Sequence, residues 1–182
     1  MDAIALLKAD HRSVEKLFKE FEAAGERAFA TKAKVVSSII TELSVHADIE
    51  ELLFYPAAAK AAAHTKPMVL ESLEEHLSVK RLLADVEKME ASDERFDAKV
   101  TVLIEQVRHH VREEEDDLFP KVTSGLSPER LEELGDELDM ARATAATHPH
   151  PHAPDTLPGK AVAGVVSGVI DRARDAAEHL TS

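Results

Sequence analysis

The chain contains no cysteine and no tryptophan, and Tyr55 is the only tyrosine among its 182 residues. Without cysteine, the sequence excludes disulfides, zinc ribbons, iron–sulfur clusters and thiol catalysis. Any bound metal must therefore be held by His, Asp, Glu or Tyr. Glycine is scarce as well, with six residues, whereas Ala, Leu, Glu and Lys are frequent. Strong helix formers with few glycines predict an all-α protein.

Basic residues are in the minority: 22 Lys and Arg stand against 35 Asp and Glu, and the formal net charge is -13. Nucleic acids and anionic membrane surfaces both require a basic face, so we expect neither as a partner. The longest mainly apolar run, residues 161–170, is too short to span a bilayer. The first residues lack the basic and apolar regions of a signal peptide. These absences predict a cytoplasmic protein.

One motif occurs twice, at residues 46–56 and 110–120. Each copy reads His-x-x-x-Glu-Glu, two further residues, an apolar residue, an aromatic residue and Pro. Residues four apart are neighbours on one face of a helix. The histidine and the first glutamate of each copy can therefore direct an imidazole and a carboxylate to the same point.

Apolar residues recur every three or four positions in four long segments, which predicts four amphipathic helices. Their expected ranges are 2–27, 31–63, 67–89 and 93–125, with Thr31 and either Ser92 or Asp93 as N-caps. Pro56 lies inside the second helix and predicts a kink there. Four helices with short connections make an up-down-up-down four-helix bundle, which we expect over residues 1–125.

A helical extension is expected over residues 126–182. Ser127 and Pro128 are typical of a helix start, and this helix is predicted to run to about residue 144. A linker rich in His and Pro follows at about residues 147–158, and it is more typical of a solvated segment than of a metal site; its histidines are His148, His150 and His152. The last amphipathic segment is a candidate output surface or homo-oligomer contact.

Six polar residues occupy positions where the helix stripes otherwise carry apolar residues: His11, His46, Glu50, His76, His110 and Glu114. Counting from the turns at about 1.5 Å per helical residue places all six within one turn of the same level. Two buried carboxylates without compensation would each cost several kcal/mol. Two divalent or trivalent ions would supply the missing positive charge. The donor set suits iron, whereas manganese and zinc fit less well and stay open as alternatives.

Other polar residues near the two motifs have weaker assignments. Glu51, Glu113 and Glu115 are expected to be solvated or to orient the imidazoles, and Glu113 is the substitute ligand if Glu114 is not one. Tyr55 is a less favoured ligand, because an ideal helix places it opposite His46. No metal-binding role is assigned to the remaining histidines of the chain, His64, His109 and His179.

At this point the sequence resembles the hemerythrin-like (HHE cation-binding) family over about residues 1–123. The resemblance is carried by Asp10-His11, Glu75-His76 and the two His-x-x-x-Glu-Glu motifs with their aromatic-proline endings. Residues 131–135 of the extension are similar to hemerythrin-like proteins of actinobacteria, including mycobacteria. The resemblance implies a non-haem di-iron site in a four-helix bundle, with an oxo or hydroxo bridge between the irons.

The ligand assignment implied by the resemblance is symmetrical. His11 and His46 would bind one iron, His76 and His110 would bind the other, and the bridging residues would be Glu50 and Glu114.

Lys80 departs from the oxygen-carrying members of the family, which have a further histidine one turn after the position of His76. The second iron would then keep an open position for water, peroxide or nitric oxide. We therefore expect binding and turnover of small oxidants, catalase-like with hydrogen peroxide first and with nitric oxide second, and Lys80 as a hydrogen-bond donor to the oxidant. The alternatives are a reversible oxygen- or iron-binding or sensing module without turnover, and a bundle with a structural metal or none.

Overall fold

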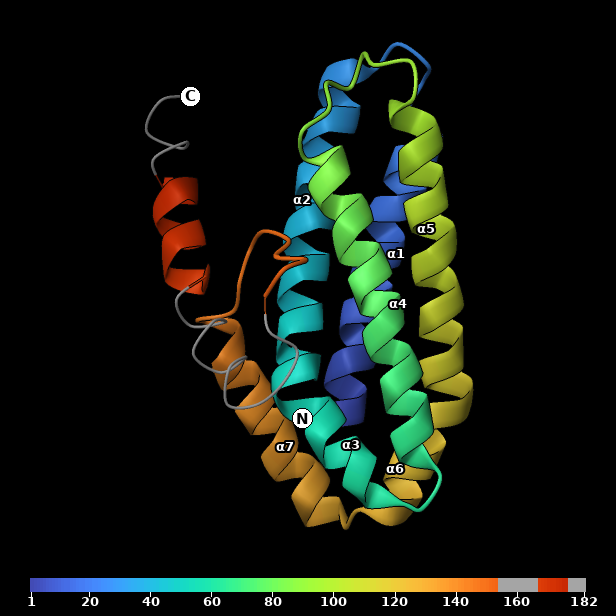
Figure 1. Ribbon diagram of the computed structural model, residues 1–182, viewed down its shortest axis with the longest axis vertical. Coiled ribbons are helices and arrows are strands. Elements are labelled where there is room, and N and C mark those ends of the chain that lie inside the picture. Colours follow the sequence, from blue (N-terminus) through green and yellow to red (C-terminus); the bar gives the residue numbers. More distant parts are fainter. Residues whose placement is uncertain (154–166, 177–182) are drawn as a thin grey trace.

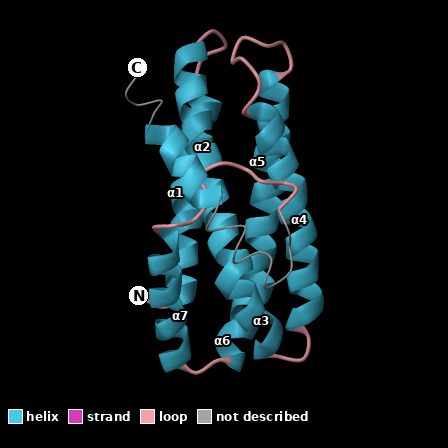
Figure 2. Ribbon diagram, turned by 60° about the vertical axis from the view of Figure 1, so that its left-hand side comes forward, coloured by secondary structure: helices cyan, strands magenta, loops and turns pink. Residues whose placement is uncertain are grey.

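The computed structural model describes residues 1–153 and 167–176, and these residues form helices and loops without any strand (Figures 1 and 2). Four rods lie side by side along one axis and alternate in direction. They are α1 (Ala3–Ala23), α2 (Phe29–Ile49) continued by η1 (Glu50–Phe54) and α3 (Tyr55–Ala61), α4 (Thr65–Val86), and α5 (Phe96–Glu113) continued by η2 (Glu114–Leu118) and α6 (Phe119–Gly125). The predicted all-α four-helix bundle is confirmed.

The predicted N-caps of the second and fourth rods are wrong. The first turn of α2 forms ahead of Thr31, because the backbone N–H of Lys32 donates to the carbonyl of Ala28 at 2.9 Å. Asp93 instead accepts a hydrogen bond from the backbone N–H of Glu90 at 2.9 Å within the connecting loop, and α5 starts after Arg95. Both helices start without a side-chain cap, so their packing against the bundle must stabilise these ends.

Both copies of the repeated motif contain a π-helical turn directly before the proline. In η1 the backbone N–H of Tyr55 reaches the carbonyl of Glu50, five residues back, and in η2 the N–H of Phe119 reaches Glu114. Proline lacks an N–H, and its ring would clash with the carbonyl four residues earlier in a regular helix. One inserted residue relieves that conflict, so the kink predicted at Pro56 takes the form of a π turn.

The apolar interior is divided into two clusters, one above and one below a polar layer. The cluster nearer the α1–α2 connection contains Phe18, Leu43 and Leu83. The other cluster contains Leu7 and Phe54, and it extends to helix α7 (Pro128–Arg142) outside the bundle. The polar layer is thus flanked by apolar side chains on both sides along the bundle axis.

Helix α7 begins as predicted, because the Ser127 side chain accepts a hydrogen bond from the N–H of Arg130 at 3.2 Å. Its leucines pack into the lower cluster, and they are Leu131, Leu134 and Leu138. Gly135 lies against the start of the chain, where a Cβ atom would come within 2.1 Å of the Met1 carbonyl oxygen. A glycine is therefore required for α7 to approach α1 this closely.

A further helix at residues 167–176 lies beside the chain that leaves α7 (Figure 1). The carboxylate of Asp171 accepts hydrogen bonds from the backbone N–H groups of Thr147 and His148, both at 3.1 Å, and the His150 ring lies 2.9 Å away. His148 is also paired with Glu87, the residue directly after α4. The expectation of a solvated His/Pro linker is therefore wrong for His148 and His150.

The rest of the C-terminal region shows two further features. His152 is exposed, as expected for a linker. A Cβ atom on Gly168 would lie 2.0 Å from the Thr144 carbonyl oxygen, so this glycine permits close packing. His179 lies outside the described residues. Within the described part of the chain, no helix has both the length and the apolarity needed to cross a bilayer.

Candidate metal centre

The polar layer contains all six residues whose convergence was predicted from the helix register. Each is at most 6% exposed, and together they come from four rods: His11 of α1, His46 of α2, Glu50 of η1, His76 of α4, His110 of α5 and Glu114 of η2. The structure therefore brings these side chains together in one buried layer. Their role as metal ligands is considered below.

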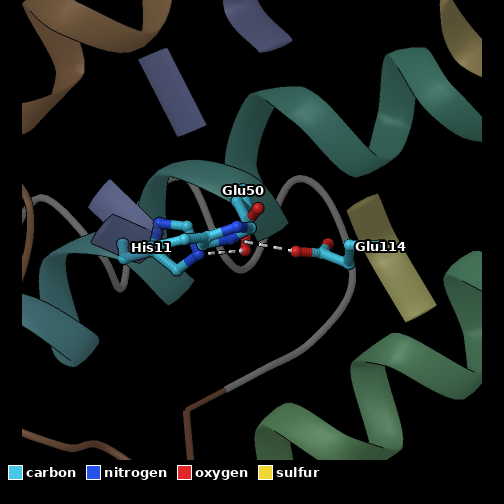
Figure 3. Close-up of side chains that lie close together, drawn as sticks. His11, Glu50 and Glu114 are labelled. Carbon is cyan, nitrogen blue, oxygen red and sulfur yellow. Dashed lines mark ion pairs between the residues drawn. The ribbon is translucent and has the colours of Figure 1, made fainter. Parts of the chain in front are cut away.

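One half of the centre contains His11, His46, Glu50 and Glu114, whose nearest donor atoms all lie within 4.8 Å of one another. His46 Nε2 is 3.1 Å from a carboxylate oxygen of Glu50. His11 Nε2 is 3.3 Å from a carboxylate oxygen of Glu114, and Figure 3 shows these two side chains close to Glu50. Two imidazoles and two carboxylates thus face a common point.

The other half contains His76 and His110, whose Nε2 atoms are 3.0 Å apart. His76 Nε2 is 3.5 Å from the same Glu50 oxygen that faces His46, and His110 Nε2 is 3.6 Å from Glu114. Both carboxylates therefore lie between the two histidine pairs. This is the arrangement that bridging carboxylates require.

Every one of the four histidines has a carboxylate on the other side of its ring. The Nδ1–oxygen distances are 2.8 Å for His11 and Glu115, 3.3 Å for His46 and Asp10, 2.9 Å for His76 and Glu51, and 2.7 Å for His110 and Glu75. A carboxylate at Nδ1 holds the ring proton there and leaves the Nε2 lone pair free to bind a metal. The surrounding acids thus fix both the tautomer and the ring orientation.

Asp10 and Glu75 each contact a histidine of a neighbouring helix and not the histidine that follows them in sequence. Asp10 precedes His11 in α1 but holds His46 of α2, and Glu75 precedes His76 in α4 but holds His110 of α5. The sequence reasoning used both acids only as motif residues and missed their orienting role. Their position directly before two candidate ligands was the available signal.

Glu51 and Glu115 orient imidazoles, and Glu113 is solvated, so all three agree with the two alternatives predicted for them. The prediction of Glu113 as a substitute for Glu114 is wrong. The Glu113 side chain is 43% exposed and lies 3.3 Å from His109 Nε2 on the outer face of α5. It therefore neither reaches the buried layer nor substitutes there for Glu114. A group of Glu75, His109 and Glu113 does bring donor atoms together at this partly exposed surface.

Four buried atoms that face the centre have no hydrogen-bond partner: Nε2 of His11 and His46, Oε1 of Glu50 and Oε2 of Glu114. Buried polar atoms without partners are rare, because each carries a desolvation cost. The four atoms are two imidazole nitrogens and two carboxylate oxygens, which are iron-type donors. The residues present therefore fit a cation held between them.

The pKa values also indicate that the centre favours positive charge between its carboxylates. Burial opposes protonation of His46, but the Glu50 carboxylate and the hydrogen bond to Asp10 raise its pKa to about 10. Burial and the charge of His110 lower the pKa of His76 to about 3. Burial also opposes ionisation of Glu114, yet His110 and His11 lower its pKa to about 2. In the protein alone, imidazolium protons thus supply charge that a metal ion would otherwise bring.

Tyr55 lies inside the centre, and the expectation from an ideal helix is therefore wrong. Its hydroxyl donates to Glu114 at 2.9 Å and lies 3.1 Å from His76 Nε2 and 3.4 Å from His110 Nε2. In a π turn the residue five positions on lies over the first, so Tyr55 faces the same way as Glu50. Burial and the charges of Glu114 and Glu50 raise the pKa of Tyr55 well above its usual value, so the phenol keeps its proton in the protein alone.

Phe119 is the counterpart of Tyr55 in the second copy of the motif. Its ring stacks on the His11 ring with 5.8 Å between centroids and lies edge-on to Phe54. One half of the centre therefore has a phenol oxygen, and the other half has an apolar cover. The two candidate metal positions are chemically unequal despite the repeated sequence.

Lys80 reaches the centre through an intermediary. Its ammonium lies 2.7 Å from one oxygen of Glu51 and 2.6 Å from the other, and Glu51 in turn holds the Nδ1 of His76. The Lys80 side chain is 13% exposed and borders a cavity next to the histidines. Donation from Lys80 to a bound oxidant stays a prediction.

A family model described as the hemerythrin HHE cation binding domain matches residues 2–122. The chain belongs to this family. The HHE domain identified in this way contains the bundle and all six candidate ligands.

Individual relatives agree with this placement. The chain is 29% identical over 170 residues to an uncharacterized hemerythrin-like protein of Schizosaccharomyces pombe, which covers 93% of this chain and 83% of the relative. It is 28% identical over 138 residues to a DNA nickase of a Nostoc species; the match covers 76% of this chain but only 38% of the nickase. A crystal structure of an HHE cation binding domain-containing protein from Mycobacterium kansasii has a TM-score of 0.66 at 22% identity, covering 78% of this chain and 88% of that one. That likeness shows the shared fold.

A cavity of about 410 Å³ adjoins the histidine layer of the HHE domain. It borders all four imidazoles, and its lining includes neither of the two central carboxylates nor Tyr55. Ligands therefore have space to approach the centre from the side opposite the carboxylates.

Proposed function

We propose that this HHE protein holds two iron ions joined by an oxo or hydroxo bridge. His11 and His46 bind one ion, and His76 and His110 bind the other. Glu50 and Glu114 bridge them, and the single observation that supports this most is the position of both carboxylates between the two histidine pairs. The resulting set of imidazoles and carboxylates suits iron.

Tyr55 is proposed as an additional oxygen donor on the His76/His110 side. Its hydroxyl already lies within 3.4 Å of both Nε2 atoms. Ligation requires loss of the phenol proton, which a bound cation favours because it offsets the nearby carboxylate charges that raise the pKa of Tyr55. Lys80 stands where oxygen-carrying hemerythrins have a further histidine, and it pairs with Glu51 instead. The His76/His110 side therefore has one imidazole fewer, which would leave room for an exogenous ligand beside Tyr55.

We propose further that the centre binds and turns over small oxidants, first hydrogen peroxide in a catalase-like reaction and second nitric oxide. Bound iron would supply the electrons and accept them back, so that two hydrogen peroxide molecules give one oxygen molecule and two waters. The two buried apolar clusters flank the centre along the bundle axis. In the metal-free protein Tyr55 keeps its proton and donates it in a hydrogen bond to Glu114. Lys80 with Glu51 fixes the His76 ring.

Metal analysis with a visible spectrum tests the proposed centre, and oxygen evolution from peroxide tests the reaction. Protein purified without chelators should contain two irons per chain and show a charge-transfer band. Glu50→Gln should lose at least one iron and the oxygen evolution, whereas the exposed control Glu113→Gln should keep both. Fewer than one iron per chain would contradict the centre. Full iron loading without oxygen evolution would contradict only the catalase-like reaction.

A reversible oxygen- or iron-binding or sensing module is the second candidate, and one contact favours it. Arg142 at the end of α7 is paired with Asp10, the carboxylate that holds His46. The extension therefore reaches a candidate ligand through a single residue. In a sensor, Arg142→Gln should change iron or oxygen affinity, and the loaded protein should bind oxygen reversibly without consuming peroxide. Unchanged affinity in this variant would argue against sensing through α7.

A further inference from the structure

The cavity beside the histidine layer is much larger than the small oxidants require. Its volume of about 410 Å³ falls in the range of about 300–1,000 Å³ typical of organic ligand sites. A water molecule occupies roughly 30 Å³ in the liquid, and hydrogen peroxide is only slightly larger. The available space is thus about ten times what an oxidant would fill.

The inner wall of this cavity is apolar. It extends from the imidazoles toward the α1–α2 connection, and the side chains that form it are Val14, Phe18, Leu43, Val79, Leu83 and Val107. Such a wall offers no hydrogen bonds to water but stabilises a hydrocarbon chain, since burial of apolar area is favourable. The shape and chemistry therefore favour an organic guest with an apolar chain.

The rim of the cavity between α1 and α5 carries charge. Arg108 is held there by Glu15 and Glu22 of α1, and it closes one end of the rim with contacts of 2.6–3.0 Å. Arg12 and Arg112 also line the cavity and are exposed.

Neither Arg12 nor Arg112 has an ion pair with any residue in the described part of the chain. The carboxylates of Glu15 and Glu115 at the rim are already paired, with Arg108 and His11 respectively. Asp116 is the remaining rim carboxylate without an ion pair among the described residues. The rim thus carries two guanidinium groups and one carboxylate that have no ion pair among the described residues. This excess of positive charge favours an anionic head group.

We propose that this cavity binds a medium-chain fatty carboxylate. Its carboxylate meets Arg12 and Arg112 at the rim, and its hydrocarbon chain passes the imidazoles and lies along the apolar wall toward the α1–α2 connection. The proposal needs only the protein chain, so it is independent of the iron chemistry proposed above. A bound chain would also cover the open side of the centre and so limit access of small oxidants.

Titration calorimetry of the full-length protein as purified tests the proposal with octanoate, decanoate and dodecanoate, below their micelle concentrations. One carboxylate should bind per chain. Affinity should rise about fourfold for each added methylene until the cavity is full. Absence of saturable binding, or binding of many molecules per chain, would overturn the proposal.

The head-group contact is tested by comparing decanoate with 1-decanol. The double variant Arg12→Gln and Arg112→Gln should lower decanoate affinity about tenfold, because charge-assisted hydrogen bonds are lost, and leave 1-decanol affinity unchanged. Lys16→Gln is the matched control: it removes a positive charge from α1 that does not line the cavity. An equal response of both ligands, or an equal loss in the control, would contradict a carboxylate site and leave only nonspecific apolar binding.

The chain position is tested by filling the cavity. Val107→Phe adds bulk to the apolar wall and should abolish decanoate binding while circular dichroism shows a folded helical protein. Unchanged binding in a folded variant would place the ligand elsewhere and refute the proposal. If this variant fails to fold, the arginine comparison decides the matter by itself.

Discussion

Loading the metal-free protein with a divalent cation near neutral pH should release protons. His46 has a pKa raised to about 10 by Glu50 and Asp10 despite its burial, so it is protonated at pH 7 in the protein alone. A metal can bind its Nε2 only after that proton leaves. The raised pKa of Tyr55 means that ligation by the phenol would release a second proton.

The magnitude follows from the His46 value. Between pH 7 and a pKa of about 10, displacement of one proton weakens apparent metal affinity about a thousandfold, or roughly 4 kcal/mol. Affinity should therefore rise about tenfold per pH unit for each proton displaced. The gain should level off only once the pH passes the pKa of the group concerned.

Zinc is a suitable redox-inert probe, and calorimetry in buffers of different ionisation enthalpy counts the protons released. Wild-type protein should release a proton from His46 and a further one if Tyr55 ligates, and His110, whose pKa the carboxylates of Glu114 and Glu75 raise despite its burial, can add to the count. Tyr55→Phe should lower the count by one, and Asp10→Asn should reduce the pH dependence because the pKa of His46 falls. A metal affinity independent of pH between 6 and 9 would refute the reasoning about His46. An unchanged count in Tyr55→Phe would remove only the phenol from the ligand set.

Three further predictions concern single residues. Glu75→Gln should weaken metal affinity about 10- to 100-fold, because the His110 ring loses its charged partner; exposed Glu74→Gln is the control, and equal effects of the two would contradict the orienting role. Gly135→Ala should lower the free energy of unfolding by about 1–3 kcal/mol, because its Cβ atom meets backbone, whereas Gly25→Ala, with open space around it, should leave thermal unfolding nearly unchanged. Burial lowers the pKa of His148, but its carboxylate partners Glu87 and Asp175 raise that pKa overall. The protonated His148 should therefore stabilise the C-terminal helix fully below the ordinary histidine pKa near 6.5. This stabilisation should be lost as the pH rises through the pKa of His148 in the folded protein. The protection factors of the amides in that helix, which correct for the base-catalysed intrinsic exchange rate, should fall over this window, and pH-independent protection factors would contradict the contact.

The buried layer was predictable because helix register is a local property. His11, His46 and His76 replace apolar residues at three- and four-residue spacing, and about 3.6 residues per turn fixes which face they share. Once these faces are known, a four-helix bundle can bury them in only a few arrangements. The sequence therefore predicted the fold and the meeting of the six polar side chains.

Other features depended on which helices are neighbours and how they are rotated. Asp10 and His46 are 36 residues apart in the chain, and no sequence pattern indicates that they form a hydrogen bond. Glu113 and Glu114 differ by one helical position, about 100° of rotation. The helix register favoured Glu114 but kept Glu113 as a substitute, and the packed structure excludes Glu113 by placing it at the surface. His148 and His150 likewise contact carboxylates of distant segments, Glu87 and Asp171 respectively.

Tyr55 shows most clearly which features the sequence predicts and which depend on the tertiary structure. The sequence by itself determined that an aromatic residue and a proline follow each His-x-x-x-Glu-Glu motif. Only the tertiary structure decided that the backbone inserts a π turn at Glu50, which moves the phenol from the far face of the helix into the centre. The physical reason is that a π turn exchanges one set of backbone hydrogen bonds for another at small cost, and the proline together with packing around the polar layer selects between them.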